Sequence, residues 1–141
     1  MFSLLKLSWA SQCPDSAPLL LRLAAGAIFL VHGWQKLTMG VAGVAGFLGQ
    51  LGFPAPEFFA VILIAVEVAG GAALILGVLT RFAAALSSIV ALVALLTVHL
   101  SKGFFVNEGG YEFIALILAA SLALLITGAG KYSLDRTLKL D

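Results

Sequence analysis

Apolar residues fill four long stretches of this 141-residue chain, and polar residues gather between them. A transmembrane helix needs about 20 predominantly apolar residues, with a usual range of about 17–25. Four segments meet this requirement: residues 18–37, 56–79, 81–100 and 110–128. The pattern predicts an all-α membrane protein in which residues 1–141 form one domain, a bundle of four transmembrane helices.

The connection between the first two predicted spans is apolar but too short to cross a membrane. Within residues 39–55, glycine recurs at every third position from Gly40 to Gly52. This period fits neither an α-helix nor a strand. Short apolar segments of this kind are usually re-entrant or interfacial. We therefore expect a short helix that lies in the membrane surface and caps the bundle, with a flexible loop as the alternative.

The composition fits a membrane protein and argues against several other classes. Apolar residues make up 62% of the chain and charged residues 11%, and the mean hydropathy is +1.13. A soluble domain averages roughly half apolar and a quarter charged residues. The net charge of +1 argues against nucleic-acid binding, which requires a clustered basic surface. The single Cys13 has no partner for a disulfide or a CxxC site.

The distribution of lysine and arginine predicts the orientation. An even number of spans puts both termini on one side of the membrane. The other side then carries only Lys36 and Lys102. The side of the termini holds six basic residues: Lys6, Arg22, Arg81, Lys131, Arg136 and Lys139. Because cytoplasmic loops are rich in lysine and arginine, we expect both termini in the cytoplasm.

Several ionisable side chains fall inside the predicted spans, where each needs a polar partner. At about 1.5 Å rise per residue, His32 lies about 21 Å up the first span and Glu67 about 18 Å up the second. Lys36, His99 and Glu112 come out near 27 Å, in a second layer (estimated in the same way, about 1.5 Å per residue). We therefore expect His32 to pair with Glu67 at mid-depth, with the second layer extending a polar track above them.

Two interpretations of this track remain open. Arg22, His32 and Lys36 fall within an arc of about 80° on the first span, so that face should point into the bundle. The track is then able to bind a small polar or redox-active ligand, such as a quinone headgroup, or to pass protons. Alternatively, the same groups form structural hydrogen bonds that fix the register of the helices.

Metal and haem sites are disfavoured by the sequence. His32 and His99 would have to ligate one haem iron from two helices, although they differ in depth by about 6 Å. The chain contains no HExxH motif, no P-loop and no GxGxxG in a strand–helix setting. We expect no metal site, and a quinone is the candidate cofactor.

Short motifs in a fixed order connect the chain to a known family. They are R-x3-G at Arg22, HGWQKL at 32–37, GFPAP at 52–56, E-x2-GG at Glu67, LGVLTR ending at Arg81, KGFF at 102–105, GGYE at 109–112 and GxGKYSLD at 128–135. Over residues 19–135 the chain resembles the DoxX-like membrane proteins. That resemblance implies a four-helix inner-membrane protein of bacteria or archaea. Relatives include subunits of archaeal thiosulfate:quinone oxidoreductase, and others look like membrane partners of enzymes that handle thiol and oxidative stress.

Together these observations predict a membrane component of a redox or thiol-stress system. If the chain belongs to an enzyme, we expect it to be a subunit of a quinone-linked oxidoreductase, working with the lipid bilayer and a soluble redox partner. The alternative is non-enzymatic: a membrane scaffold that recruits a soluble partner, or a small transporter that forms a homo-oligomer. The expected site residues are Glu67 and His32 at the core, lined by Arg22, Lys36, His99 and Glu112.

Overall fold

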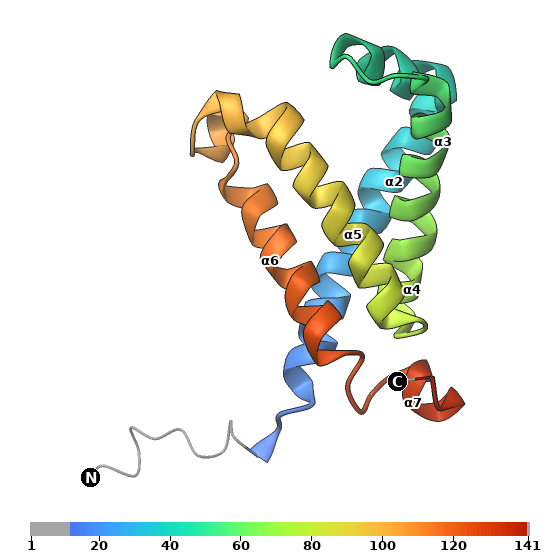
Figure 1. Ribbon diagram of the computed structural model, residues 1–141. Coiled ribbons are helices and arrows are strands. Elements are labelled where there is room, and N and C mark those ends of the chain that lie inside the picture. Colours follow the sequence, from blue (N-terminus) through green and yellow to red (C-terminus); the bar gives the residue numbers. More distant parts are fainter. Residues whose placement is uncertain (1–11, 141) are drawn as a thin grey trace, which may run out of the picture.

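The computed structural model describes residues 12–140, which contain helices and no strands (Figure 1). Lys6, one of the basic residues counted for the orientation, lies outside this range. The elements in chain order are α2 (Ser16–Gln50), α3 (Pro56–Ala65), the π-helical turn η2 (Val66–Gly70), α4 (Gly71–Leu76), α5 (Thr80–Ala94), the π-helical turn η3 (Leu95–His99), the 3₁₀ turns η4 (Leu100–Lys102) and η5 (Val106–Glu108), α6 (Glu112–Thr127) and α7 (Leu134–Leu138).

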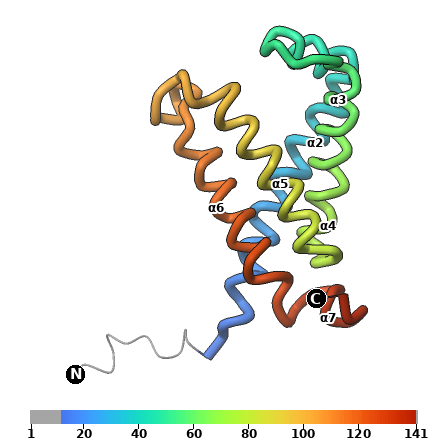
Figure 2. Tube along the Cα trace, viewed as in Figure 1, coloured from blue at the N-terminus to red at the C-terminus, as the bar shows by residue number. Residues whose placement is uncertain are grey.

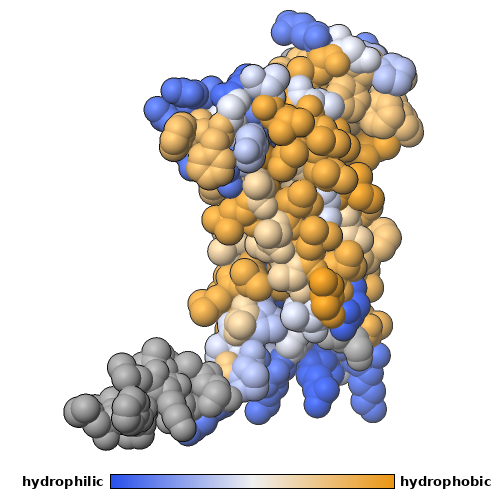
Figure 3. Space-filling view, turned by 60° about the vertical axis from the view of Figure 1, so that its left-hand side comes forward, coloured by the Kyte–Doolittle hydropathy of each residue, from blue (hydrophilic) through white to orange (hydrophobic). Residues whose placement is uncertain are grey.

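Three helical rods in the described part are long and apolar enough to cross a membrane. They comprise Ser16–Gln50, Pro56–Leu76 and Thr80–Lys102. A fourth helix, Glu112–Thr127, is apolar but only 16 residues long. Figure 3 shows an apolar belt between hydrophilic ends, as bilayer contact requires. The helical membrane architecture is confirmed, and the count of four spans stays a prediction.

Helix α2 breaks at Gly40, three residues beyond the predicted end of the first span. Gly40 has φ 78° and ψ 158°, a conformation outside the helical region, and a side chain there would meet no atom within 4 Å. Residues 41–50 are helical again and cross the end of the α2–α3 pair (Figure 1). Val44 and Leu48 pack there against Ile64 of α3. The position of residues 41–50 in the membrane surface remains a prediction.

The spans form two hairpins that pack together at one end and diverge at the other (Figures 1 and 2). One hairpin is α2 with the rod α3–η2–α4, and the other is α5 with α6. We call the end that carries α7 the proximal end, and the opposite end, with residues 50–56 and 99–112, the distal end. The main core cluster joins both hairpins through these buried residues: Ala25, Phe29, Leu74, Ala83, Ala84, Ala91, Ile117 and Leu124.

Glycines let α2 touch the backbone of the neighbouring rod. A Cβ on Gly71 would lie 2.6 Å from the backbone nitrogen of Leu30, and one on Gly26 would lie 2.8 Å from the Gly71 carbonyl oxygen. A Cβ on Gly33 would lie 2.8 Å from the backbone nitrogen of Val68. Such contacts substitute for the hydrophobic effect, which does not drive helices together in lipid. They bring η2 directly against the middle of α2.

Candidate functional site

An ion pair joins α2 to η2 beside the contact between Gly33 and Val68. Lys36 Nζ of α2 lies 2.7 Å from Glu67 Oε2 of η2 and donates a hydrogen bond to Glu67 Oε1 at 3.0 Å. The side chains are only 20% and 7% exposed, respectively. Counted along its rod, Glu67 is the twelfth residue of Pro56–Leu76, which is close to mid-span. The pair is therefore a charged centre inside the apolar belt.

The local sequence explains how the two side chains meet. Glu67 lies on the π-helical turn Val66–Gly70, which interrupts the rod between α3 and α4. A π-helical turn widens the backbone by one residue and is frequent at functional sites. Because Gly33 has no side chain, this turn can sit against α2, and Lys36 reaches the carboxylate from less than one turn further on. The missing side chain of Gly33, the π-helical turn Val66–Gly70 and the position of Lys36 three residues after Gly33 together bring the two charged groups into contact.

The structure corrects the expected partner of Glu67. Its carboxylate pairs with Lys36, whereas the side chain of His32 is exposed. His32 precedes Lys36 by four residues and is therefore rotated by about 40° around α2. The long flexible stem of lysine also lets its ammonium group bond a carboxylate at a different depth from its own Cα. Two residues at the same estimated depth on neighbouring helices, such as His32 and Glu67, therefore need not form a pair.

His99 and Glu112 make local bonds in the distal loop between α5 and α6. His99 Nδ1 lies 2.7 Å from the Gly109 carbonyl oxygen, and the backbone N–H of Val106 donates to Glu112 Oε1 at 2.6 Å. Within residues 12–140, neither side chain bonds to Lys36 or Glu67. The structure thus gives His99 and Glu112 a role in holding this loop, and their place in a ligand pocket stays a prediction.

Arg22 is fully buried at the proximal end, distant in sequence from both of its partners. Its guanidinium group donates to the carbonyl oxygens of Leu74, at 3.5 Å, and of Tyr132. It also fills the space beside Gly77, where an added Cβ would lie 1.7 Å from Arg22 Nη1. The Asp135 carboxylate provides a compensating negative charge. Arg22 therefore fastens α2 to α4 and to the segment that follows α6.

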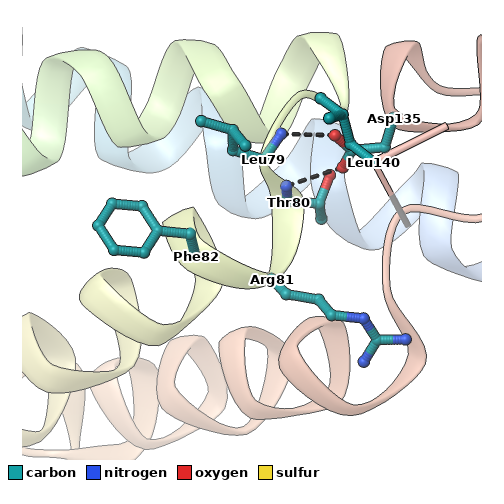
Figure 4. Close-up of a pocket in the computed structure, with 6 residues that line it drawn as sticks. All are labelled: Leu79, Thr80, Arg81, Phe82, Asp135 and Leu140. Atoms are coloured by element: carbon teal, nitrogen blue, oxygen red, sulfur yellow. Dashed lines mark hydrogen bonds between the residues drawn. The ribbon is translucent and has the colours of Figure 1, made fainter. Parts of the chain in front are cut away.

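Asp135 is a buried residue that the sequence analysis did not select. Its carboxylate accepts hydrogen bonds from the backbone N–H groups of Leu79, at 2.6 Å, and Thr80, at 2.8 Å (Figure 4). It thereby satisfies N–H groups at the start of α5, where a negative charge is also favoured by the helix dipole. The sequence feature that could have indicated its role is its place as the acidic residue that ends the GxGKYSLD motif. We call Arg22, Gly77 and Asp135 the proximal lock.

Two hollows lie near these groups. One, of about 320 Å³, is a groove lined by Leu30, Val31, Trp34 and Val68. It is entirely apolar and lies on the far side of the Gly33 contact from Lys36, judged by a rotation of about 100° per residue. The other, of about 170 Å³, is at the proximal end, where Arg81 points toward the last turn of α6 (Figure 4) and donates to its carbonyl oxygens.

Within the described residues, no three His, Cys, Asp or Glu side chains cluster in a way that would hold a metal ion. The chemistry of the buried centre is therefore that of one ammonium group and one carboxylate. Lys36 can donate to an oxygen atom of a ligand, and Glu67 can accept or return a proton.

These features define an α-helical membrane protein in which a largely buried ion pair joins two long apolar helices. The chain belongs to the DoxX family, because the model of that family, described as DoxX, matches residues 17–100. The resemblance inferred from the short motifs is thereby confirmed.

Several bacterial proteins are similar to this chain over most of their length. A Bacillus subtilis protein named "Putative oxidoreductase CatD" is 37% identical over 117 residues, covering 83% of each chain. Inner membrane protein YqjF of Escherichia coli is 32% identical over 124 residues, covering 88% of this chain and 93% of that one. Inner membrane protein YphA of the same organism is 32% identical over 123 residues, covering 84% and 87%, respectively. No solved structure matches this chain.

Proposed function

We propose that this protein is an inner-membrane component of a bacterial redox or thiol-stress system, and that it binds a quinone or a similar small molecule at the Lys36–Glu67 pair. The observation that carries the proposal is this ion pair, buried near mid-span on a π-helical turn. The name of the similar Bacillus subtilis protein, an oxidoreductase, agrees with it.

Stability alone gives little reason for such a pair. A charged side chain at the centre of a membrane helix costs about 2.5–3.5 kcal/mol on insertion scales. Pairing offsets part of that cost, yet replacing a buried ion pair by apolar residues is often neutral or stabilising. Buried ionisable residues in membrane spans are accordingly candidates for function. In quinone chemistry, Lys36 would bind a ring oxygen, and Glu67 would exchange the proton that accompanies reduction.

The topology belongs to the same proposal. We propose one domain over residues 1–141 with four spans, α6 being the fourth, and with both termini in the cytoplasm. Basic residues near the proximal end support this orientation: Arg81, Lys131, Arg136 and Lys139. A soluble redox partner would then dock at the proximal end and supply or remove electrons.

Tryptophan fluorescence gives a direct test of ligand binding. The chain has two tryptophans, and Trp34, 65% exposed, lies two residues before Lys36 on α2. In a Trp9→Phe variant reconstituted in nanodiscs, Trp34 is the sole reporter. We expect a tailed quinone to quench it saturably, because a bound quinone accepts an electron from the excited indole. A polyprenol of the same tail length, which lacks the carbonyl groups, is the control and should not quench.

Purification from native membranes gives the second arm of the test. We expect quinone to be extracted from the purified protein in stoichiometric amount and identified by mass spectrometry. If neither extraction nor saturable quenching is observed, the redox proposal is wrong. A co-purifying soluble protein would then favour the scaffold, and a symmetric oligomer around a water-filled passage would favour the transporter.

A further inference from the structure

The hollow at the proximal end has both polar and apolar walls, unlike the groove beside Trp34. It has a volume of about 170 Å³, and we call it the α5 pocket. Its walls come from the start of α5 and from the C-terminal segment, residues 131–140 (Figure 4): Leu79, Thr80, Arg81, Phe82, Asp135 and Leu140. This mixed lining suits one end of a molecule that is partly charged and partly apolar.

The hydroxyl group of Thr80 indicates that the α5 pocket takes a ligand. Thr80 is 1% exposed and lines the pocket, yet its Oγ1 atom has no hydrogen-bond partner within residues 12–140. Ser88 and Thr97 avoid the cost of an unsatisfied hydroxyl group by donating to the carbonyl oxygen four residues earlier. Thr80 lacks that option because α5 begins at this residue. A polar group of a ligand in the pocket would satisfy it.

The carboxylate of Asp135 lies next to Thr80 (Figure 4) and retains acceptor capacity. Each of its oxygen atoms accepts one backbone N–H, from Leu79 and from Thr80, whereas a carboxylate offers about four lone-pair sites. Arg22, whose charge compensates Asp135, donates its own hydrogen bonds to backbone carbonyl oxygens. Thr80 Oγ1 and the Asp135 carboxylate are thus neighbouring acceptors, which suits a primary ammonium group with its three N–H donors.

Arg81 brings a positive charge to another wall of the pocket. Its side chain extends away from Asp135 toward α6, where Nη1 donates to the carbonyl oxygens of Leu125 and Ile126 (Figure 4). A guanidinium group attracts phosphate, and the positive end of the α5 dipole acts in the same direction. A ligand with a single charge would be attracted by one wall and repelled by the other. The pocket therefore suits a zwitterion, with its ammonium group at Asp135 and a phosphate group at Arg81.

The apolar rim of the pocket indicates where this zwitterion comes from. Leu79, Phe82 and Leu140 are each more than half exposed. Thr80 is the first residue of the rod Thr80–Lys102, which is long and apolar enough to cross a membrane. We therefore expect this end of the rod at the boundary between hydrocarbon and headgroups. A zwitterion at that boundary that also meets an apolar rim is the headgroup of a phospholipid.

We propose that the α5 pocket binds the headgroup of a phospholipid with a primary ammonium group, phosphatidylethanolamine. The ammonium group donates to Thr80 Oγ1 and to the Asp135 carboxylate, and the phosphate group binds Arg81. The acyl chains pass the exposed Phe82 into the apolar belt. This inference is independent of the ligand proposed for the Lys36–Glu67 pair. The bound lipid links α5 to the C-terminal segment beside the proximal lock.

Native mass spectrometry of the detergent-purified chain, titrated with lipids of identical acyl chains, tests the choice of headgroup. Phosphatidylethanolamine should bind with a Kd about tenfold below that of phosphatidylcholine, whose methylated ammonium group has no N–H donor. Phosphatidylglycerol, which has a phosphate but no ammonium group, should also bind more weakly than phosphatidylethanolamine. Thr80→Val should raise the Kd for phosphatidylethanolamine about fivefold and leave that for phosphatidylcholine unchanged. Thr97→Val, which removes a hydroxyl group at the distal end, is the control and should change neither Kd.

Thermal unfolding distinguishes a bound lipid from a purely structural role of Thr80. In lipid-free detergent, Thr80→Val should unfold at the same temperature as the wild-type chain or slightly above it, because it loses an unsatisfied hydroxyl group. Phosphatidylethanolamine should raise the Tm of the wild-type chain more than that of Thr80→Val.

Three results would overturn the inference. The first is an equal Kd for phosphatidylethanolamine and phosphatidylcholine in the wild-type chain, a comparison that holds even if Thr80→Val does not fold. The second is tighter binding of phosphatidylglycerol, which would show that the pocket selects negative charge only. The third is displacement of the lipid by water-soluble phosphoethanolamine at the same concentration, which would assign the pocket to a free zwitterion.

Discussion

At the proximal end, Arg22 and Asp135 bond to backbone carbonyl and N–H groups, whereas within the described residues Lys36 and Glu67 bond to each other's side chains. Both sets hold α2 against the rod α3–η2–α4, and the proximal lock also binds the segment that follows α6. They differ in what surrounds them. The proximal lock is closed by α4, α5 and the segment after α6, and the Lys36–Glu67 pair lies between α2 and η2.

This difference indicates that the charged groups at the two places have different roles. A charged group bonded to several backbone groups cannot change partner without local unfolding, so it serves to hold elements together. A pair bonded through flexible side chains can exchange one partner for a ligand at little structural cost. We therefore expect substitutions in the proximal lock to lower stability, and substitutions at the pair to change ligand binding.

The largest effect should come from Gly77→Ala. Gly77 has φ +66°, and the new Cβ would overlap the Arg22 guanidinium group at 1.7 Å. Backbone strain of about 1–2 kcal/mol adds to displacement of a buried charge, which costs about 3–5 kcal/mol. We expect the free energy of unfolding in SDS titrations to fall by at least about 4 kcal/mol, or folded protein to be lost. Gly52→Ala is the matched control, because Gly52 has φ +83° and no atom nearby. Equal losses in the two variants would show that Arg22 is not fixed by its surroundings.

Lys36→Met should have the next largest effect on stability. It leaves Glu67 buried without its partner, and we expect a loss of about 2–3 kcal/mol in the same SDS titrations. The double variant Lys36→Met/Glu67→Met removes both charges and should regain most of this loss. A double variant as unstable as the single one would mean that the pair is itself a major source of stability, contrary to the comparison.

Asp135→Asn should cost less, about 1–2 kcal/mol, because the amide keeps the shape and one acceptor oxygen. It weakens the bonds to Leu79 and Thr80 and removes the charge that compensates Arg22. Asp15→Asn is the control, since Asp15 precedes α2 but its side chain makes no capping hydrogen bond. Thermal unfolding in detergent compares the two variants. A shift of equal size in both would contradict a specific role for Asp135.

The smallest change in the free energy of unfolding should come from replacing buried serines in the helix packing. The hydroxyl groups of Ser121 and Ser87 are buried without a hydrogen-bond partner within the described residues. Ser88, in contrast, donates to the Ala84 carbonyl oxygen at 2.7 Å. Ser121→Ala should therefore raise the free energy of unfolding by up to about 1 kcal/mol, and Ser88→Ala should leave it unchanged or lower it slightly. A clear loss in Ser121→Ala would reveal an unrecognised polar partner in the core.

The apolar length of the spans could be predicted from the sequence because it is set by the bilayer. The second and third predicted spans, 56–79 and 81–100, agree within three residues with Pro56–Leu76 and Thr80–Lys102. The first helical stretch runs to the break at Gly40, three residues beyond the predicted end at residue 37. A hydropathy pattern gives the length of an apolar segment, but it does not show where a residue such as Gly40 adopts a non-helical backbone conformation.

The partners of the charged residues could not be predicted in the same way. Depth estimates treat helices as straight, parallel rods, and they ignore both rotation around the axis and the reach of a side chain. Lys36 was assigned to a higher layer than Glu67, yet its flexible stem spans the difference. Asp135 lies beyond the last apolar stretch, so no pattern inside the spans pointed to it. Only the return of the chain beneath α5 brings it to Leu79 and Thr80.

The central claim is that the Lys36–Glu67 pair binds a ligand and is not needed to hold the fold. The most direct test is the Kd for a tailed quinone, measured by Trp34 quenching in nanodiscs for the wild-type chain and for Lys36→Met/Glu67→Met, both in the Trp9→Phe background. We predict that the double variant regains most of the stability that Lys36→Met loses, yet shows no saturable quenching. Unchanged affinity in a folded double variant would contradict the account.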